Sequence, residues 1–285
     1  TGTPMTFSVF VPDHEPGQRL PVLWYLSGLT CTHANVTEKG EYRAACAKAG
    51  VIFIAPDTSP RGDDVPDDAA YDFGKGAGFY VDATQEPWSA QFRMRSYIEQ
   101  ELPALIAAQF PAADMTRQGI TGHSMGGHGA LTIALRNPAR FRSVSAFAPI
   151  CAPTQVPWGE KALSRYLGED RAAWAEYDAV ALIESGARLP GVLVDQGTAD
   201  AFLDDQLGTP LLEAAQLLYG GPWVAERTAA VGASAMGSSP NEGRCRGAWA
   251  IRSASSVSDM RRSCRIRSAP SPRGATDEPP SSLRR

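Results

Sequence analysis

The pentapeptide GHSMG at residues 122–126 is the feature that most constrains how this chain can fold. It matches G-x-S-x-G, a sharp turn that joins a strand to a helix and presents a serine hydroxyl at its tip. A strand-like run at residues 118–121 precedes it, and a helix-like run at residues 127–136 follows it. A chance match in a chain with 27 glycines usually lacks that context. The sequence therefore predicts Ser124 as a nucleophile on a strand–turn–helix element.

Apolar, strand-like runs alternate with helical patterns along the first 218 residues. The strand-like runs are residues 5–11, 21–26, 51–55, 118–121, 143–148 and 191–195, and the helical patterns are residues 38–49, 91–109 and 127–136. Such alternation indicates a parallel sheet covered on both faces, which nucleotide-binding folds share. The GHSMG turn favours the α/β-hydrolase fold, an α/β class with a mostly parallel central sheet and helices on both faces. We assign residues 1–218 to this domain.

Residues 61–88 form a long segment between the second buried strand and the next helical pattern. The segment is rich in Gly and Asp and has little periodicity. Loops of that length inside a domain tend to be functional. We therefore expect this loop to lie over the active site.

The composition changes near Leu218. Residues 220–285 contain 11 Arg, no Lys and 5 acidic residues, and Arg, Ser, Gly and Pro make up 36 of these 66 residues. Such a segment buries too little apolar surface to offset its ordering entropy, so we predict that residues 219–285 are irregular or disordered. A genuine basic tail and a shifted reading frame both explain it. We favour the frameshift, because the break falls inside what should be the domain.

Charge and cysteine usage limit the partners and the compartment. The net charge is −4, which argues against nucleic acid as the main partner, and no apolar run approaches the roughly 18 residues that span a membrane. Five cysteines (Cys31, Cys46, Cys151, Cys245 and Cys264) form no C-x-x-C pair and no metal-ligand cluster. With no leader visible at Thr1, we expect a reduced cytoplasmic protein without metal or cofactor.

The predicted chemistry needs two backbone N–H groups that stabilise a developing oxyanion. One belongs to Met125, the residue after the nucleophile. The second should come from the loop after an early strand, where residues 26–32 read LSGLTCT. Gly28 permits the turn, and the N–H of Leu29 is our candidate. An ordinary exit from a strand into a loop has the same spacing.

The acid of a catalytic triad should follow a later strand, and residues 194–203 offer Asp195 and Asp200. Asp195 lies at the end of the strand, where an aspartate caps or anchors a loop. Asp200 lies on the loop beyond it, so we choose Asp200. Both also fit solvated loop aspartates.

The base is missing from its expected place. The order Ser…Asp…His requires a histidine after Asp200, and the chain has only His14, His33, His123 and His128. A structural role fits each of the four better than a base role. His33, which follows the proposed oxyanion loop, is the best substitute among them. We therefore expect the chain to be nearly inactive, because loss of a triad member costs about four to six orders of magnitude in turnover.

The motifs together resemble the S-formylglutathione hydrolase (esterase D) family of the α/β-hydrolase superfamily. The matching stretches are residues 26–32, 55–62, 76–84, 122–131, 157–162 and 195–197, which run in family order over about three quarters of the chain. The resemblance implies a thioesterase that converts S-formylglutathione to glutathione and formate in formaldehyde detoxification, with carboxylesterase activity on small esters. It implies Ser124 as nucleophile, Asp200 as acid, and Leu29 and Met125 as oxyanion donors.

The resemblance also places Cys31 beside the pocket, makes Trp158 a residue that shapes the substrate site, and allows a homodimer. The chain departs from the family pattern in lacking strands before Met5, a Gly-Tyr-Asp-His-like motif that carries the base, and a final helix. Ala199 replaces a second carboxylate, which leaves Asp200 as acid. Two other readings stay open: a non-catalytic remnant of the family, and a protein whose basic tail binds anionic partners.

Overall fold

The computed structural model describes residues 2–219 and 223–228. Its strands are β1 (Phe7–Phe10), β2 (Leu20–Leu26), β3 (Ile52–Pro56), β4 (Ala113–His123), β5 (Phe141–Phe147), β6 (Val192–Gly197) and β7 (Trp223–Thr228). Its α-helices are α1 (His33–Lys39), α2 (Tyr42–Ala49), α3 (Met94–Ser96), α4 (Leu102–Gln109), α5 (Met125–Arg136), α6 (Pro157–Leu167), α7 (Arg171–Trp174), α8 (Ala179–Glu184) and α9 (Thr209–Tyr219). Short 3-10 or π-helical turns occur at Tyr97–Glu101, Pro153–Gln155, Ala175–Tyr177 and Leu203–Leu207.

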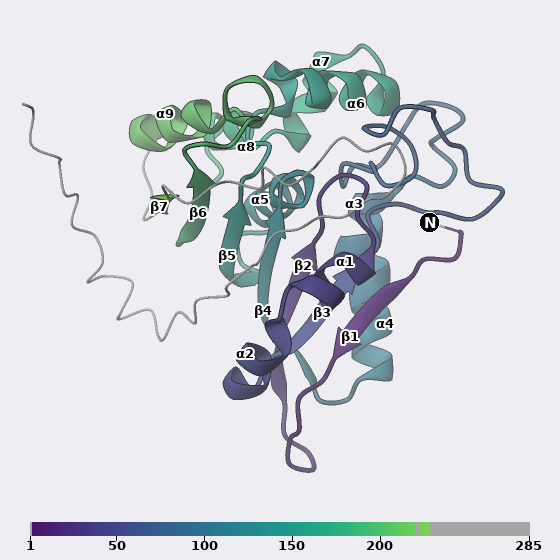
Figure 1. Cartoon of the computed structure of the whole chain (residues 1–285), viewed down its shortest axis with the longest axis vertical. Helices are drawn as coiled ribbons and strands as arrows, with labels where there is room; N and C mark the ends of the chain where they lie inside the picture. The colour runs from purple at the N-terminus through teal and green to yellow at the C-terminus, as the bar shows by residue number, and fades with distance from the viewer. Residues whose placement is uncertain (1, 220–222, 229–285) are drawn as a thin grey trace, which may run out of the picture. The chain divides into compact units, whose positions relative to one another are not determined.

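The described strands form one sheet in the order β1-β3-β2-β4-β5-β6-β7 (Figure 1). Only β1 pairs antiparallel, with β3, and the other neighbours are parallel. Leu26 at the end of β2 lies opposite Gly122 near the end of β4, and Gly122 lies opposite Ala146 of β5. The carboxyl ends of the central strands therefore reach the same edge of the sheet, where ligands bind in parallel α/β sheets.

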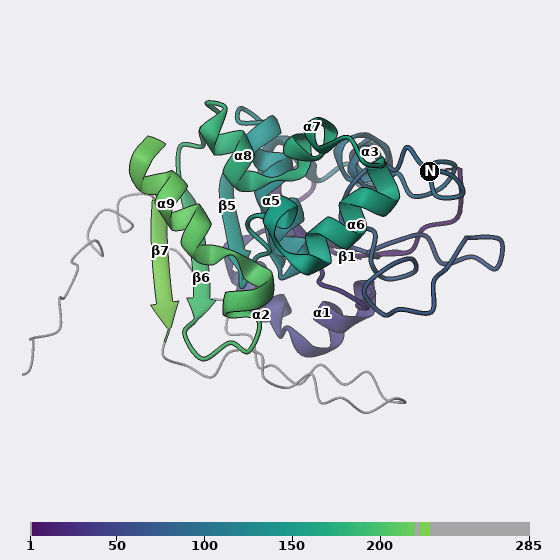
Figure 2. The same ribbon diagram turned by 90° about the horizontal axis from the view of Figure 1, so that it is seen from above.

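Helices cover both faces of the sheet, as the sequence predicted. Alternate residues of β2 point to opposite faces. Trp24 and its neighbours on that face pack with α4, α5 and α8 in the larger apolar cluster. Tyr25 and Leu23 pack with the smaller cluster formed by α1, α2 and β3. Figures 1 and 2 show α1 and α2 on one side of the central strands and α5 and α8 on the other.

The sequence predicted one helix at residues 38–49, and that prediction was wrong. The structure has α1 and α2, separated by Gly40 and Glu41. A Cβ at Gly40 would lie 2.7 Å from the carbonyl oxygen of Val36, and Glu41 adopts a left-handed φ of 45°. The chain reverses direction at this pair of residues, because an α-helix cannot continue through a left-handed residue.

The predicted boundary at residue 218 falls close to the end of α9. One strand lies beyond it: β7, which pairs parallel with β6 and which the sequence did not predict. The rest of the predicted tail, residues 229–285, lies outside the described residues. Within the described part of the chain, no helix is long and apolar enough to cross a membrane.

The long loop at residues 61–88 is anchored by aromatic side chains. The ring of Phe73 stacks on Tyr166 of α6 at 4.4 Å and meets Trp88 edge-on at 4.7 Å. The guanidinium of Arg165 lies 3.8 Å above the Phe73 ring, and Lys161 pairs with Asp72 at 2.5 Å. The loop is therefore packed onto α6 along much of its length.

Replacing Phe73 with Ala should release this loop. We expect a loss of about 3–5 kcal/mol in the free energy of unfolding, because the ring is 1% exposed and its removal leaves a cavity beside the rings of Tyr166 and Trp88. Urea unfolding measures it. Tyr71→Ala is the matched control, since Tyr71 lies in the same loop but is 60% exposed, and it should change stability by less than about 0.5 kcal/mol. Equal losses in the two variants would contradict the anchoring.

Candidate active site

Ser124 lies at the tip of a tight turn between β4 and α5. Its φ of 56° and ψ of −120° are rare for a residue with a side chain. The turn is held by the N–H of Ser124, which donates to the carbonyl of Phe147 at 2.9 Å, and by the N–H of His128, which donates to the carbonyl of Ser124 at 3.0 Å. Strain of this kind persists only where the surroundings fix it. The predicted strand–turn–helix element is present.

Small residues let the turn pack directly on β2. A Cβ on Gly126 would lie 1.9 Å from the carbonyl oxygen of Leu26, and one on Gly122 would lie 2.2 Å from the carbonyl oxygen of Gly126. Neither position has room for a methyl group. The two glycines of the motif are therefore steric requirements of this turn.

The loop after β2 reaches the nucleophile. A Cβ on Gly28 would lie 3.2 Å from both the Cβ of Ser124 and the carbonyl oxygen of His123, so the two loops are in contact. Within the described residues, the N–H of Leu29 donates no hydrogen bond. Met125 is the first residue of α5, so its N–H has no partner within the helix. Both N–H groups are available for an oxyanion beside Ser124.

The two candidate acids lie at different points of one segment, and the choice of Asp200 stays a prediction. Asp195 belongs to β6, and its carbonyl accepts the N–H of Ala148 at 2.8 Å, so it helps join β6 to the end of β5. Asp200 lies on the loop after β6. Its carboxylate accepts the N–H of Phe202 at 3.0 Å, and the side-chain amide of Gln196 lies 3.4 Å away. The negative charge of Asp200 raises the pKa of His123, against the larger effect of burial.

Comparison with known proteins assigns the family. A family model described as a putative esterase matches residues 1–217. A curated S-formylglutathione hydrolase from Paracoccus denitrificans (strain Pd 1222) is 54% identical over 204 residues, which cover 72% of this chain and 73% of that protein. The chain belongs to this esterase family. The resemblance identified from the sequence motifs is confirmed.

Solved structures agree. An S-formylglutathione hydrolase from Agrobacterium tumefaciens matches with a TM-score of 0.77 and 57% identity, covering 79% of this chain and 81% of that one. A fluorophosphonate-binding serine hydrolase from Staphylococcus aureus matches with a TM-score of 0.59 at 17% identity, over 78% of this chain and 83% of that one, and shows the shared fold only. The α/β-hydrolase fold predicted from the sequence is thereby confirmed.

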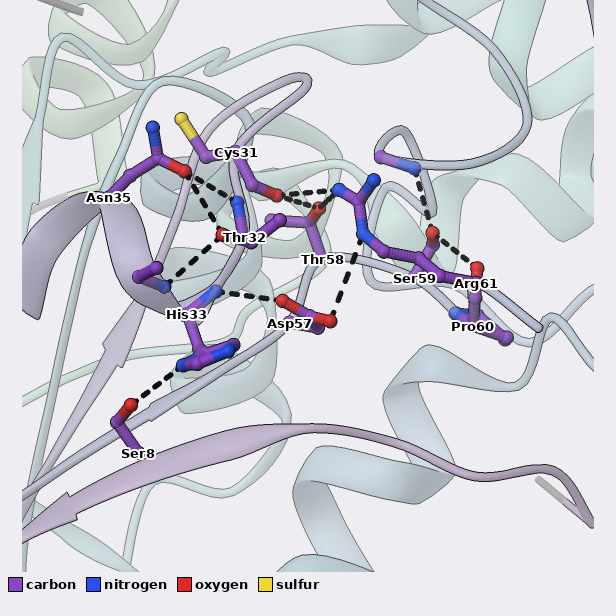
Figure 3. A network of polar contacts seen from close by, with 12 residues as sticks. Ser8, Cys31, Thr32, His33, Asn35, Asp57, Thr58, Ser59, Pro60 and Arg61 are labelled. Carbon is purple, nitrogen blue, oxygen red and sulfur yellow. Dashed lines mark hydrogen bonds and ion pairs between the residues drawn. The ribbon is translucent and has the colours of Figure 1, made fainter.

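Esterases of this kind need a base beside the serine, and all four histidines of the chain lie among the described residues. Three have other contacts. The ring of His33 bonds to Ser8 Oγ of β1 at 2.7 Å, that of His14 to the carbonyl of Pro12 at 2.9 Å, and that of His128 to the carbonyl of Phe79 at 3.0 Å. His33, the best substitute suggested by the sequence, thus points toward β1 (Figure 3).

His123 is the histidine next to the nucleophile. Burial lowers its pKa from 6.5 to about 4, against the opposing effect of the Asp200 carboxylate. Its imidazole is therefore neutral at pH 7. An efficient general base has a pKa near the working pH, so a group that titrates near 4 accepts the serine proton poorly.

The two proposed substrate-site residues, Cys31 and Trp158, are both buried. Cys31 is buried, and its thiol contributes to the raised pKa of the Tyr80 hydroxyl, after the larger effect of burial. Trp158 is also buried, and its ring packs against that of Phe202 at 4.8 Å. Because Phe202 is two residues beyond Asp200, Trp158 packs against the loop that carries the predicted acid. Their roles toward substrate stay predictions.

Two contacts that the sequence did not reveal connect the long loop to the site. The hydroxyl of Tyr80 donates to the carbonyl of Ser27 at 2.8 Å, and the ring of His128 donates a hydrogen bond to the carbonyl of Phe79. The predicted position of residues 61–88 is thus correct for this part of the loop. The signal in the sequence was His128 one turn after the nucleophile, on the buried face of α5.

Gly126→Ala should destabilise the whole domain, because the new methyl group would overlap the Leu26 carbonyl. We expect a loss of more than about 3 kcal/mol in thermal or urea unfolding. Gly62→Ala is the matched control, since a Cβ there meets a Val65 methyl at 3.6 Å and the Thr3 hydroxyl at 3.9 Å, both ordinary contacts. A Gly126→Ala variant as stable as Gly62→Ala would refute this packing.

Stability should fall on acidification, partly because of His128. Its Nε2 donates to Phe79, its Nδ1 is buried with no hydrogen-bond partner among the described residues, and burial lowers its pKa from 6.5 to about 4. Between these values the unfolded chain binds the proton more readily, so the free energy of unfolding drops as pH falls. The slope reaches about 1.4 kcal/mol per pH unit for one such histidine.

The measurement is urea unfolding between pH 7 and pH 4.5. His128→Gln keeps a donor for Phe79 and should flatten the pH dependence, whereas His14→Gln, at an exposed turn, should leave it unchanged. The same slope in His128→Gln and in the parent chain would exclude His128 as a source of the acid sensitivity.

Proposed function

We propose that the chain is a serine thioesterase whose substrate is S-formylglutathione. The observation that supports the proposal is the contact between the loop at Gly28 and Ser124, because Leu29 follows Gly28 and Met125 follows Ser124, and neither N–H donates a hydrogen bond among the described residues. Two similar proteins, 54% and 57% identical, bear the name S-formylglutathione hydrolase.

In this proposal, the hydroxyl of Ser124 loses its proton to solvent water as its Oγ attacks the formyl carbon, and the two N–H groups stabilise the oxyanion that forms. The carbon–sulfur bond breaks and glutathione leaves as a thiolate. Water then attacks the formyl ester on Ser124, which releases formate and restores the hydroxyl. A thiol has a pKa of about 8.5, so the thiolate departs without the proton that an alkoxide needs.

The first proton transfer is the slow point, because none of the four histidines has both the position and the pKa of a base. We propose that turnover relies on the oxyanion donors and on substrate binding. Together they leave a rate about 10³–10⁴-fold above that of the reaction in water. A family member without activity, which only binds acyl thiols, is the other reading that this observation favours.

We also propose that the chain acts in the cytoplasm as part of formaldehyde detoxification. Cys31, Cys46 and Cys151 are buried thiols, as in a reduced protein. The charge of −10 on residues 1–219 disfavours nucleic acid as a partner. No metal or cofactor takes part in the proposed steps, and a homodimer remains the oligomeric prediction.

The chain should hydrolyse p-nitrophenyl acetate only weakly. We expect a kcat at least about 10⁴-fold below that of the Paracoccus relative under the same conditions, because the base is missing. Ser124→Ala should lower the remaining rate further if the serine is still the nucleophile. If Ser124→Ala leaves the remaining rate unchanged, that result would favour a family member without activity. Turnover equal to that of the relative, abolished by Ser124→Ala, would show that the chain has a base, and His33→Gln and His123→Gln would then locate it.

A further inference from the structure

The turn that carries Leu29 is fixed from outside by the segment that follows β3. Figure 3 shows the side chains of Asp57, Thr58 and Arg61 converging on the backbone of residues 31–33. The carbonyl of Cys31 accepts hydrogen bonds from Nη2 of Arg61, at 2.9 Å, and from the hydroxyl of Thr58. Two donors on one carbonyl fix its direction, and with it the peptide planes of the turn.

A second connection lies one step along the chain. The N–H of His33 donates to Oδ1 of Asp57 at 2.8 Å, and Oδ2 of the same carboxylate lies 3.8 Å from Nε of Arg61. Arg61 and Asp57 therefore form an ion pair, and each of them also makes a hydrogen bond to the backbone of the turn. The guanidinium is a planar fork, which a single ammonium group cannot replace in full.

The turn needs such support because it is strained. Thr30 has a φ of 64°, and its N–H donates to the carbonyl of Gly76 at 2.9 Å. A Cβ on Gly76 would lie 3.1 Å from both Nη2 of Arg61 and the Cα of Thr30. The guanidinium of Arg61 thus lies close to both Gly76 of the long loop and the turn at Thr30, which follows Leu29 and which we call the oxyanion turn. A left-handed conformation is unfavourable for a residue with a branched side chain, so Thr30 relaxes when its neighbours release it.

We propose that Arg61 is a positioning residue for the oxyanion hole: through the carbonyl of Cys31 and the carboxylate of Asp57, it holds the turn in the conformation that directs the Leu29 N–H toward Ser124. This inference rests on the proposed function, because it assigns Leu29 its donor role. It also predicts a purely structural effect on the turn. The competing role is an anion site, since 32% of the Arg61 side chain is exposed and the proposed substrate carries carboxylates.

The first test follows the turn itself and needs no turnover. Hydrogen exchange of peptides covering residues 26–34, and alkylation of Cys31 by N-ethylmaleimide, are read by mass spectrometry. Cys46 is the internal reference, since it is 4% exposed and burial raises its pKa to about 11. In Arg61→Gln we expect Cys31 to react roughly tenfold faster, as lost hydrogen bonds let the turn open, while Cys46 stays unchanged.

Three further variants make the test specific. Arg61→Lys should give an intermediate rate, because lysine can supply one donor to Cys31. Thr58→Val removes the other donor with little change of shape and should act in the same direction, and it answers the question if Arg61→Gln fails to fold. Arg188→Gln is the matched control, since Arg188 also binds backbone carbonyls, those of Ile183 and Ala187, and should have no effect on Cys31.

The second test separates positioning from anion binding. On p-nitrophenyl acetate, a neutral ester, Arg61→Gln should lower kcat by about 10–100-fold with a KM change below about threefold, because a displaced donor mainly affects the transition state. A rise in KM for S-formylglutathione alone, with kcat kept, would overturn positioning in favour of the anion site. If the parent chain shows no Ser124-dependent turnover, the proposed function fails. The exchange and alkylation data then still decide whether Arg61 positions the turn. Unchanged exchange and alkylation in Arg61→Gln and Thr58→Val would overturn the proposal.

Discussion

The parallel pairing of β2 with β4 is the constraint on which the site depends. Its register sets Leu26 opposite Gly122, so the two strands end level and their loops leave the sheet side by side. The loop after β2 then contacts Ser124 at Gly28, and the turn after β4 packs its Gly126 on the carbonyl of Leu26. A slip of one residue would turn every side chain of β2 to the other face and separate the nucleophile from the oxyanion turn. The geometry of the site is therefore a property of the core.

Backbone strain gathers at this edge of the sheet. The described residues other than glycine with a positive φ are Thr30, Glu41, Phe79, Tyr80, Ser124 and Ala148. All except Glu41 belong to the nucleophile turn, the oxyanion turn or the segments bonded to them. Each such residue costs about 1–3 kcal/mol, so the surrounding hydrogen bonds and packing must hold it in place. The domain thus uses part of the stability of its core to keep the proposed nucleophile and its two proposed oxyanion donors in fixed positions.

The sequence predicted the parts of the fold that depend on local pattern. Buried strands such as β3 and the turn around Ser124 could be predicted because apolar runs and small residues are required there whatever the neighbours are. The break at Gly40 was missed, since a helical pattern on both sides hides it. The contacts of Arg61 with Cys31 and of His33 with Ser8 join residues 30 and 25 positions apart. Such pairs depend on how loops pack, and no periodicity encodes them.

The electrostatics around Ser124 explain why an oxyanion site and a base are separable parts of this fold. The N–H groups of Leu29 and Met125 are fixed by backbone geometry and carry the same partial charge at every pH. A base must instead be an imidazole with a pKa near neutrality, which needs both solvent access and a carboxylate partner. His123 is partly exposed and feels the charge of Asp200, but desolvation of its ring outweighs that charge and lowers its pKa to about 4. A chain can therefore retain the strained serine turn and the proposed oxyanion donors without a base. These groups alone are most useful for substrates whose leaving group departs as an anion.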